Sequence, residues 1–181
     1  MQFLEILNRR QSVRAYSDRP VESEKLERCL EAARIAPSAC NSQPWKFIVV
    51  DDPELKNEIA GYASAGLIPM NRFVVQSPVL VVAVRESANF TSKVGAMLKD
   101  KPYTLMDIGM AVLQFCLQAT AEGLGTCIIG WFDEKKVKKT LHIPAGKRAE
   151  LIIAVGYAVE NYPLRNKVRK EMAEIRSCNR Y

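Results

Sequence analysis

Three arginines surround one serine in RRQSVRAY, the stretch at residues 9–16. In an extended segment, alternate side chains point to the same side, so Arg10, Ser12 and Arg14 would share one face. A guanidinium group can bind two phosphate oxygens at once, and a serine hydroxyl can donate a further hydrogen bond. A phosphate site, a solvated basic loop and an arm for nucleic acid all agree with the stretch, which by itself does not decide among them.

A second stretch, APSACNSQPWKF at residues 36–47, carries amide groups between two prolines. The side chains of Asn41 and Gln43 each offer a donor and an acceptor, which is the chemistry needed to recognise the edge of a heterocycle. The alternative is a turn after a helix, in which Ser38 and Asn41 bond to local backbone. Taken alone, the stretch favours the turn.

Two more stretches are weaker signals. GLGTCIIGWF, at residues 123–132, has three glycines that would let the backbone bend tightly or approach a ligand. Its spacing matches neither a dinucleotide-binding fingerprint nor a P-loop. PLRNKVRK, at residues 163–170, places Lys167 and Arg169 in alternate positions, a pattern that is also typical of a solvated tail.

Composition limits the classes of function. The 181 residues include 25% charged and 48% hydrophobic ones, which predicts one globular domain over residues 1–181. The single histidine, His142, disfavours metal hydrolases and Ser-His-Asp enzymes, so we expect no metal. A net charge of +6 suggests an anionic partner or a solvated surface. The basic residues cluster at 9–19, 135–148 and 165–180 without a repeated motif that interleaves them with exposed aromatic residues, so we expect no nucleic acid.

The cysteines and the apolar segments bear on location. The five cysteines are odd in number and widely spaced, and none forms a CxxC pair. This pattern predicts reduced thiols in a cytoplasm rather than a disulfide framework or a zinc site. We see no apolar run long enough to cross a bilayer and no signal peptide, so we expect a cytoplasmic protein without a membrane.

The hydrophobic periodicity predicts the elements that must position these stretches. Helices and strands are mixed without strict alternation, which predicts an α+β fold. We expect helices at 2–9, 22–35, 54–62, 104–123 and within 133–142, and strands at 45–53, 78–86, 126–132 and 149–158.

The helix predicted at 104–123 is apolar almost all round. Thr104 and Asp107 have the spacing of a capping box, and Gly123 suits a C-terminal cap. A helix that is apolar on every side must be covered on every side, either by its own core or by a second subunit.

Together, these four stretches resemble the nitroreductase family, whose members are flavin enzymes that hold FMN at the interface of an obligate homodimer. RRQSVRAY is similar to the N-terminal phosphate motif of the family, and APSACNSQPWKF to its most recognisable block. DIGMAVLQFCLQATAEGLGTCIIGWF is similar to the central helix, the glycine turn and the flavin-facing strand. The resemblance implies a central, mainly antiparallel sheet flanked by helices, a long buried helix and an intertwined homodimer whose C-terminal segment wraps onto the partner.

The resemblance also implies which residues bind FMN. Arg10 and Ser12, helped by Lys167 and Arg169, would bind the phosphate, and Arg14 would lie near the pyrimidine edge of the ring. The 37–41 segment would reach the FMN of the other subunit, and the backbone at 129–130 would lie along the ring near N5. The complete implied set is Arg10, Gln11, Ser12, Arg14, Pro37, Ser38, Ala39, Asn41, Ile129, Gly130, Lys167 and Arg169.

The activity implied is an FMN-dependent NAD(P)H oxidoreductase with ping-pong kinetics. A hydride from NADH or NADPH would enter at N5 of FMN and pass to an electron-poor small molecule such as a nitroaromatic or a quinone. No side chain need react, because the cofactor carries the chemistry. The alternatives are an FMN enzyme for enone reduction or reductive dehalogenation, and a non-catalytic protein that binds flavin or a polyanion.

Two regions match the family less well. The segment 86–103 is where a substrate lid would lie, and its sequence does not name a substrate. Longer relatives have a further Asn and Lys that contact the flavin, and Asn71 and Arg72 are their possible counterparts here.

Overall fold

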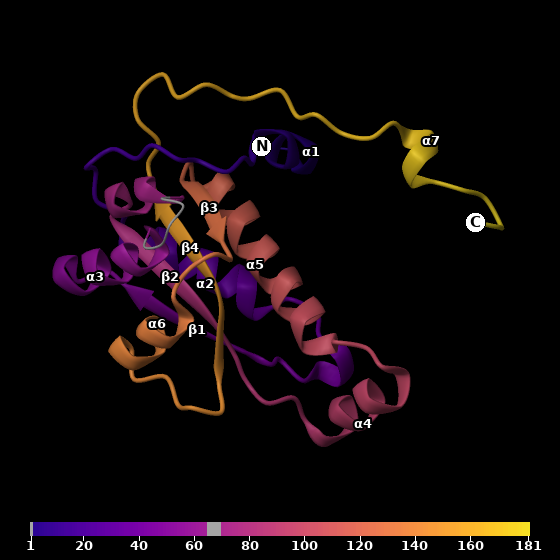
Figure 1. The fold of residues 1–181 in the computed structure, drawn as a ribbon. Coiled ribbons are helices and arrows are strands. Elements are labelled where there is room, and N and C mark those ends of the chain that lie inside the picture. The colour runs from indigo at the N-terminus through magenta and orange to yellow at the C-terminus, as the bar shows by residue number, and fades with distance from the viewer. Residues whose placement is uncertain (1, 65–69) are drawn as a thin grey trace.

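The structure is a computed structural model that describes residues 2–64 and 70–181. Its centre is a four-stranded antiparallel sheet in the order β1-β2-β4-β3 (Figure 1). The strands are β1 (Trp45–Val50), β2 (Val79–Arg85), β3 (Gly125–Ile129) and β4 (Arg148–Gly156). All four predicted strands are present. The one expected over 126–132 is too long, because its pairing with β4 stops at Ile129.

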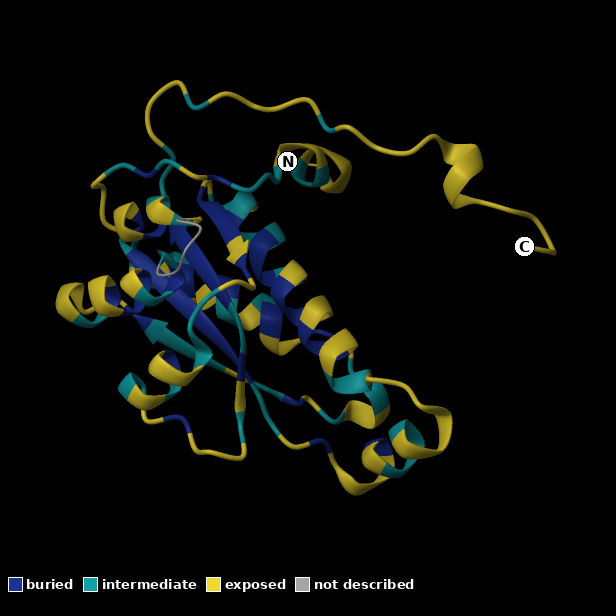
Figure 2. Cartoon of the chain, viewed as in Figure 1, coloured by how far each residue is buried: buried dark blue, intermediate teal, exposed yellow. Residues whose placement is uncertain are grey.

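The sheet is buried on both faces, as Figure 2 shows. Two hydrophobic clusters form the core, one on each side of the sheet. β2 contributes alternate residues to each, because successive side chains of a strand point to opposite faces. Leu80, Val82 and Val84 belong to one cluster, and Val79, Val81 and Ala83 to the other.

Helices supply the rest of both clusters. The face that carries Val81 packs against α2 (Ser23–Arg34) and α5 (Tyr103–Ala121). The opposite face packs against α3 (Pro53–Ser64), the 3-10 turn η2 (Arg72–Gln76) and α6 (Glu134–Thr140). The remaining elements are α1 (Phe3–Arg9), η1 (Ala39–Asn41), α4 (Phe90–Lys99) and α7 (Met172–Ile175).

The ends of α5 differ from one another. At its C-terminus, Gly123 has a φ of +78° and the N–H of Leu124 donates to the carbonyl of Ala119 at 2.8 Å, as a glycine cap predicts. The predicted capping box at the N-terminus is wrong. The helix begins at Tyr103 after Pro102, so Thr104 lies inside the first turn, and Asp107 is buried instead.

α5 is buried along one face only. The opposite face exposes four large apolar side chains, Leu105, Met106, Met110 and Leu113. Within the described residues, α5 is the one helix that is long and apolar enough to span a membrane by length and composition. The apolar face formed by Leu105, Met106, Met110 and Leu113 is not covered by the rest of the described residues.

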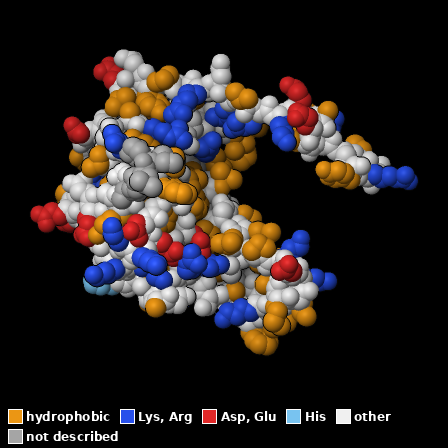
Figure 3. Space-filling model, viewed as in Figure 1, with side chains coloured by type: hydrophobic (Ala, Val, Ile, Leu, Met, Phe, Trp, Pro, Cys, Tyr) orange, Lys and Arg blue, Asp and Glu red, His pale blue; other side chains and the backbone are white. Residues whose placement is uncertain are grey.

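The last part of the chain, residues 163–181, is called the arm here. It runs away from the body and is exposed along almost its whole length (Figures 1 and 2). Between the arm and α5 the molecule is hollowed, and hydrophobic side chains line the α5 side of this hollow (Figure 3).

Candidate functional site

The stretch RRQSVRAY lies alongside β3. Ser12 forms a parallel bridge with Thr126, and the N–H of Val13 donates to the carbonyl of Thr126 at 2.9 Å. Gly125 is required at this crossing, because a Cβ atom on it would lie 2.7 Å from a methyl carbon of Val13. The extended segment is thus held in register on the edge of the sheet.

The arm is tied to this same stretch by side chains. The Gln11 amide donates from Nε2 to the carbonyl of Pro163 at 3.0 Å and accepts at Oε1 from the N–H of Arg165 at 3.0 Å. Nη2 of Arg165 donates to the carbonyl of Ser12 at 2.9 Å. Nζ of Lys167 donates to the carbonyl of Arg10 at 2.6 Å. Segments from opposite ends of the sequence therefore build one structure.

Between them lies a cavity of about 260 Å³, called the cationic cavity here. No acidic residue lines it. Desolvation lowers the pKa of Lys167, and the charges of Arg10 and Arg169 lower it further. Cations held this close without a counter-charge favour an anion between them. The lining residues are Arg10, Gln11, Ser12, Arg14, Arg165, Asn166, Lys167 and Arg169.

Six residues of the predicted site meet at this cavity: Arg10, Gln11, Ser12, Arg14, Lys167 and Arg169. The Gln11 side chain holds the arm, because both of its amide atoms bond to the backbone of Pro163 and Arg165. Arg165 was missed by the sequence reasoning. Its signal was present, because it continues the alternation of Lys167 and Arg169 by one step.

The segment 36–43, called the η1 segment here, has an unusual backbone. Cys40, Asn41 and Gln43 have φ values of 52°, 50° and 46°, in the left-handed region that side chains rarely adopt. Side chains hold this shape: Ser38 Oγ accepts from the N–H of Gln43 at 2.9 Å, and Asp107 Oδ1 accepts from the N–H of Ala39 at 3.1 Å. The predicted turn is therefore present, and it is a constrained one.

α4 is attached to the η1 segment. Nδ2 of Asn89 donates to the carbonyl of Cys40 at 2.9 Å, and its backbone N–H donates to Ser42 Oγ at 2.8 Å. Asn89 also caps α4 by accepting from the N–H of Ser92 at 2.9 Å. The outward side of the helix exposes Phe90, Met97 and Leu98. The region expected to form a lid thus contains a helix that is attached to the η1 segment by hydrogen bonds.

The cationic cavity and the η1 segment lie at opposite ends of α5. The cavity adjoins Thr126, just beyond the C-terminus of the helix, and the η1 segment contacts Asp107 near its N-terminus. A helix of 19 residues spans about 28 Å. One chain therefore does not bring Pro37, Ser38, Ala39 and Asn41 to the cavity.

Ile129 and Gly130 lie where β3 ends. Ile129 is buried, whereas Ile128 and Trp131 on either side expose 41% and 63% of their surface, which leaves an apolar surface beside the strand end. Nδ2 of Asn71 donates to the carbonyl of Trp131 at 3.2 Å, so Asn71 adjoins this region. Gly130 is four residues beyond Thr126, or about 13 Å along an extended chain.

A comparison with known proteins identifies the family. The model of the nitroreductase family matches residues 7–157. The chain belongs to the nitroreductase family. The predicted family and the predicted α+β fold are thus confirmed. Lys167 and Arg169 lie beyond the matched residues, so their place at the cavity is an observation of the structure alone.

Individual nitroreductases cover nearly the whole chain. An oxygen-insensitive NADPH nitroreductase of Helicobacter pylori is 31% identical over 86% of this chain and 87% of its own length. The solved structure of an FMN-dependent nitroreductase from Clostridium difficile R20291 is 27% identical, with a TM-score of 0.76 over 98% of this chain and 99% of that one. An iodotyrosine deiodinase of Thermotoga neapolitana is 28% identical over 88% of this chain and 90% of its own length.

Proposed function

We propose that the protein is an FMN-dependent NAD(P)H oxidoreductase that reduces an electron-poor small molecule, such as a nitroaromatic or a quinone, by a ping-pong mechanism. The cationic cavity is the observation that carries this proposal. Family membership and the named activities of the relatives support it.

The residues present fit FMN. Its terminal phosphate is a dianion, which suits a cavity lined by cations and one hydroxyl and free of acidic residues. Arg10, Ser12, Lys167 and Arg169 would hold that phosphate, with Arg165 added to the predicted set. Arg14 would lie toward the ring, where a fixed cation stabilises negative charge on a reduced flavin. The 129–130 backbone and the exposed Trp131 would border the ring.

Bound FMN would supply the redox chemistry, which is hydride transfer from NAD(P)H to the acceptor. The protein supplies the cationic cavity, the apolar surface at the end of β3 and a scaffold that holds both in register. No nucleophile or metal of the protein is needed. Within the described residues, no group of three or more His, Cys, Asp and Glu side chains is arranged to hold a metal ion.

The proposal includes a homodimer. Its main support is the exposed apolar face of α5, formed by Leu105, Met106, Met110 and Leu113. Gly109 lies within this face, and no atom lies within 4 Å of where its Cβ would be. A glycine inside an exposed helix costs about 1 kcal/mol relative to alanine. Close approach by the backbone of a second copy would account for it.

The arm would reach that second copy. Its exposed apolar side chains are Leu164, Val168, Met172 and Ile175, which is a pattern suited to burial rather than to a solvated tail. Within the arm, Arg169 lines the cationic cavity, and Met172 follows three residues later. In the proposed dimer, the cationic cavity of one subunit lies beside the η1 segment of the other. The arm that leaves this cavity would therefore contact the surface of the other subunit next to its η1 segment.

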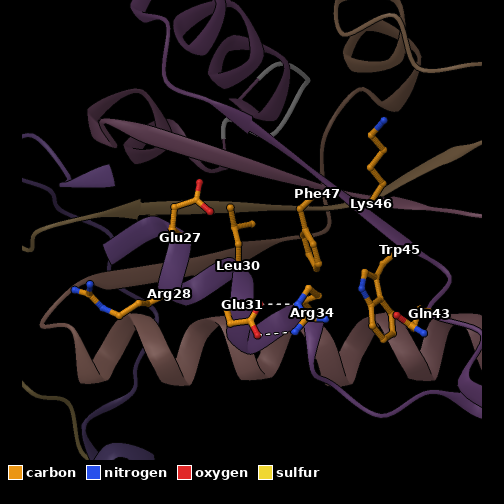
Figure 4. Close-up of a pocket in the computed structure, with 9 residues that line it drawn as sticks. All are labelled: Glu27, Arg28, Leu30, Glu31, Arg34, Gln43, Trp45, Lys46 and Phe47. Atoms are coloured by element: carbon orange, nitrogen blue, oxygen red, sulfur yellow. Dashed lines mark hydrogen bonds and ion pairs between the residues drawn. The ribbon is translucent and has the colours of Figure 1, made fainter. Parts of the chain in front are cut away.

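A groove of about 670 Å³ adjoins the η1 segment, between α2 and β1 (Figure 4). Leu30 of α2, together with Trp45 and Phe47 of β1, gives it an apolar wall, and Arg34 and Glu31 pair on its rim at 2.6 and 2.7 Å. β1 is an edge strand of the sheet, so the groove is open on that side. We assign this groove to the arm of the second copy.

The acceptor is the least constrained part of the proposal. The relative named iodotyrosine deiodinase is a specific reason to keep reductive dehalogenation as the second candidate. A cytoplasmic location also stays a prediction, which agrees with the five free cysteines.

An absorption spectrum tests the proposal directly. The purified protein is incubated with FMN, desalted and mixed without oxygen with NADPH and then with NADH. We expect flavin bands that bleach with at least one nucleotide and return when a nitroaromatic, a quinone or a halogenated phenol is added. Bands that never bleach would make the protein a flavin carrier. A protein that retains no FMN would contradict the whole proposal.

A further inference from the structure

Asp107 is a carboxylate in the buried face of an apolar helix. Only 2% of its surface is exposed. Oδ1 accepts a hydrogen bond from the N–H of Ala39, whereas Oδ2 is buried and has no hydrogen-bond partner among residues 2–64 and 70–181. A buried carboxylate with a single donor is costly, since it loses its hydration without full compensation. Such a residue needs an explanation beyond packing.

The hydrogen bond of Asp107 joins a core helix to a segment with a left-handed backbone. α5 packs in the core between α2 and the sheet. The η1 segment holds three non-glycine residues with positive φ, a conformation that persists only when its surroundings fix it. A backbone N–H bonded to a carboxylate is a charge-assisted pair, stronger than the neutral bonds of Ser38 and Asn89 to the same segment.

The hydrogen bond from Asp107 is made to Ala39, a residue of the proposed FMN-contacting stretch. Ala39 lies at the centre of the 37–41 stretch that, under the proposed function, reaches the FMN held by the partner subunit. Met106 and Met110, on the exposed face of the same helix, border Asp107 within one turn. α5 therefore carries the contact between subunits on one face and the anchor of the η1 segment on the other.

We propose that Asp107 is a positioning residue that acts across the subunit interface: it holds the η1 segment of its own chain in the shape that grips the flavin bound in the partner's cationic cavity. The proposal rests on the proposed function, because it requires both FMN and the homodimer. It adds a residue outside the predicted site and a direction of action, from one chain to the cofactor of the other.

The first test compares Asp107→Ala, Asp107→Asn and Asp18→Ala. Asp107→Ala removes a hydrogen bond to a charged group and should weaken FMN binding by about 10- to 100-fold. Asp107→Asn keeps an oxygen that can accept from the N–H of Ala39. The affinity of this variant for FMN should therefore lie within about fivefold of that of the wild type. Asp18 is an exposed aspartate outside the site and serves as the control. Fluorescence titration measures affinity, and light scattering confirms that each variant is a dimer.

A mixed dimer tests the direction of action. Subunits carrying Arg10→Ala and Asp107→Ala, with different tags, are co-expressed and purified as the heterodimer. If Asp107 acts on the partner's flavin, one site combines an intact cavity with an intact η1 segment, and the other carries both defects. Titration should then give one FMN of wild-type affinity per heterodimer. Two equal, weakened sites would mean that Asp107 acts within its own chain and would overturn the proposal.

Two further outcomes keep the proposals separate. If the wild-type protein binds no FMN, the proposed function fails before Asp107 is tested. If it binds FMN tightly while Asp107→Ala is a folded dimer of unchanged affinity, only the positioning role fails. Hydrogen exchange at residues 36–43 gives an independent readout, since loss of the bond should reduce protection there in Asp107→Ala and not in Asp107→Asn. Unchanged exchange in both variants would also overturn the role.

Discussion

The two ends of α5 offer contrasting ways to grip a ligand. Beyond its C-terminus, the cationic cavity gathers Arg10, Lys167 and Arg169 from segments far apart in sequence, and its attraction is long-range charge. Near its N-terminus, the η1 segment has no charged side chain and offers a constrained backbone instead. The first should respond to pH and salt and the second to geometry. The variants described next change the cationic cavity alone or change the cavity and the η1 segment together.

The largest effect should come from a change that disables both ends at once. Met110→Glu places an unpaired carboxylate of each subunit in the proposed dimer interface, where desolvation costs several kcal/mol. We expect the dimer dissociation constant to rise by at least about 100-fold and FMN affinity to fall with it. Sedimentation velocity and flavin titration measure the two quantities. Val75→Glu, on the exposed part of η2, is the control and should change neither.

Arg10→Ala should affect only the charged end. Loss of a charge-assisted contact with the phosphate should weaken FMN binding by about 10- to 100-fold, with the dimer intact. The salt dependence of binding should also become shallower, because fewer cations contribute. Arg9→Ala is the matched control, since Arg9 is half-exposed and pairs with Glu5 at 3.7 Å. Equal losses in the two variants would mean that general charge, rather than the cavity, attracts the cofactor.

Gln11→Ala should produce a smaller loss at the same end. The variant keeps every cation but removes the amide that fixes the backbone at Pro163 and Arg165. Two neutral hydrogen bonds contribute about 1 kcal/mol each, so we expect about 5- to 30-fold weaker binding. Because Gln11 acts through the arm, its effect and that of Lys167→Ala should not add in the double variant. Additive losses would show that Gln11 contacts the ligand independently.

The smallest effect is a pH dependence that only the charged end should show. Desolvation and the nearby arginines lower the pKa of Lys167, and a bound phosphate dianion would raise it again. FMN should therefore bind most tightly below the free-state pKa and progressively less tightly as the pH rises toward the bound-state pKa. Each unit between the two values is worth about tenfold in affinity. Lys167→Gln should flatten this part of the profile, and Asp107→Ala should leave it in place.

Sequence reasoning succeeded where a pattern repeats along the chain. All four strands were predicted, because their apolar runs end at polar or turn residues. The cations at residues 10, 14, 167 and 169 were found from alternation and resemblance, and they meet at one cavity. Arg165 follows the same alternation and could have been included.

Sequence reasoning failed where tertiary packing determines the local structure. Thr104 and Asp107 have the right spacing for a capping box, but packing starts the helix at Tyr103 and turns Asp107 inward. α4 was not predicted, because its exposed Phe90, Met97 and Leu98 face away from the core and give no inward apolar stripe. Cys40 and Gln43 have a left-handed backbone although neither is a glycine, so the sequence gives no signal of this conformation.

The meeting of residues 10–12 with the arm has a consequence for biosynthesis. Lys167 and the Arg10 carbonyl that it contacts are separated by 157 positions in the sequence. At a translation rate of about 5–20 residues per second, the ribosome needs roughly 8 to 30 seconds to make the intervening chain. During that interval Arg10 and Arg14 are already made, but the cavity lacks Arg165, Lys167 and Arg169, which are three of its five cations. Because both segments line the cavity, we expect tight FMN binding only after residues 165–169 have been made.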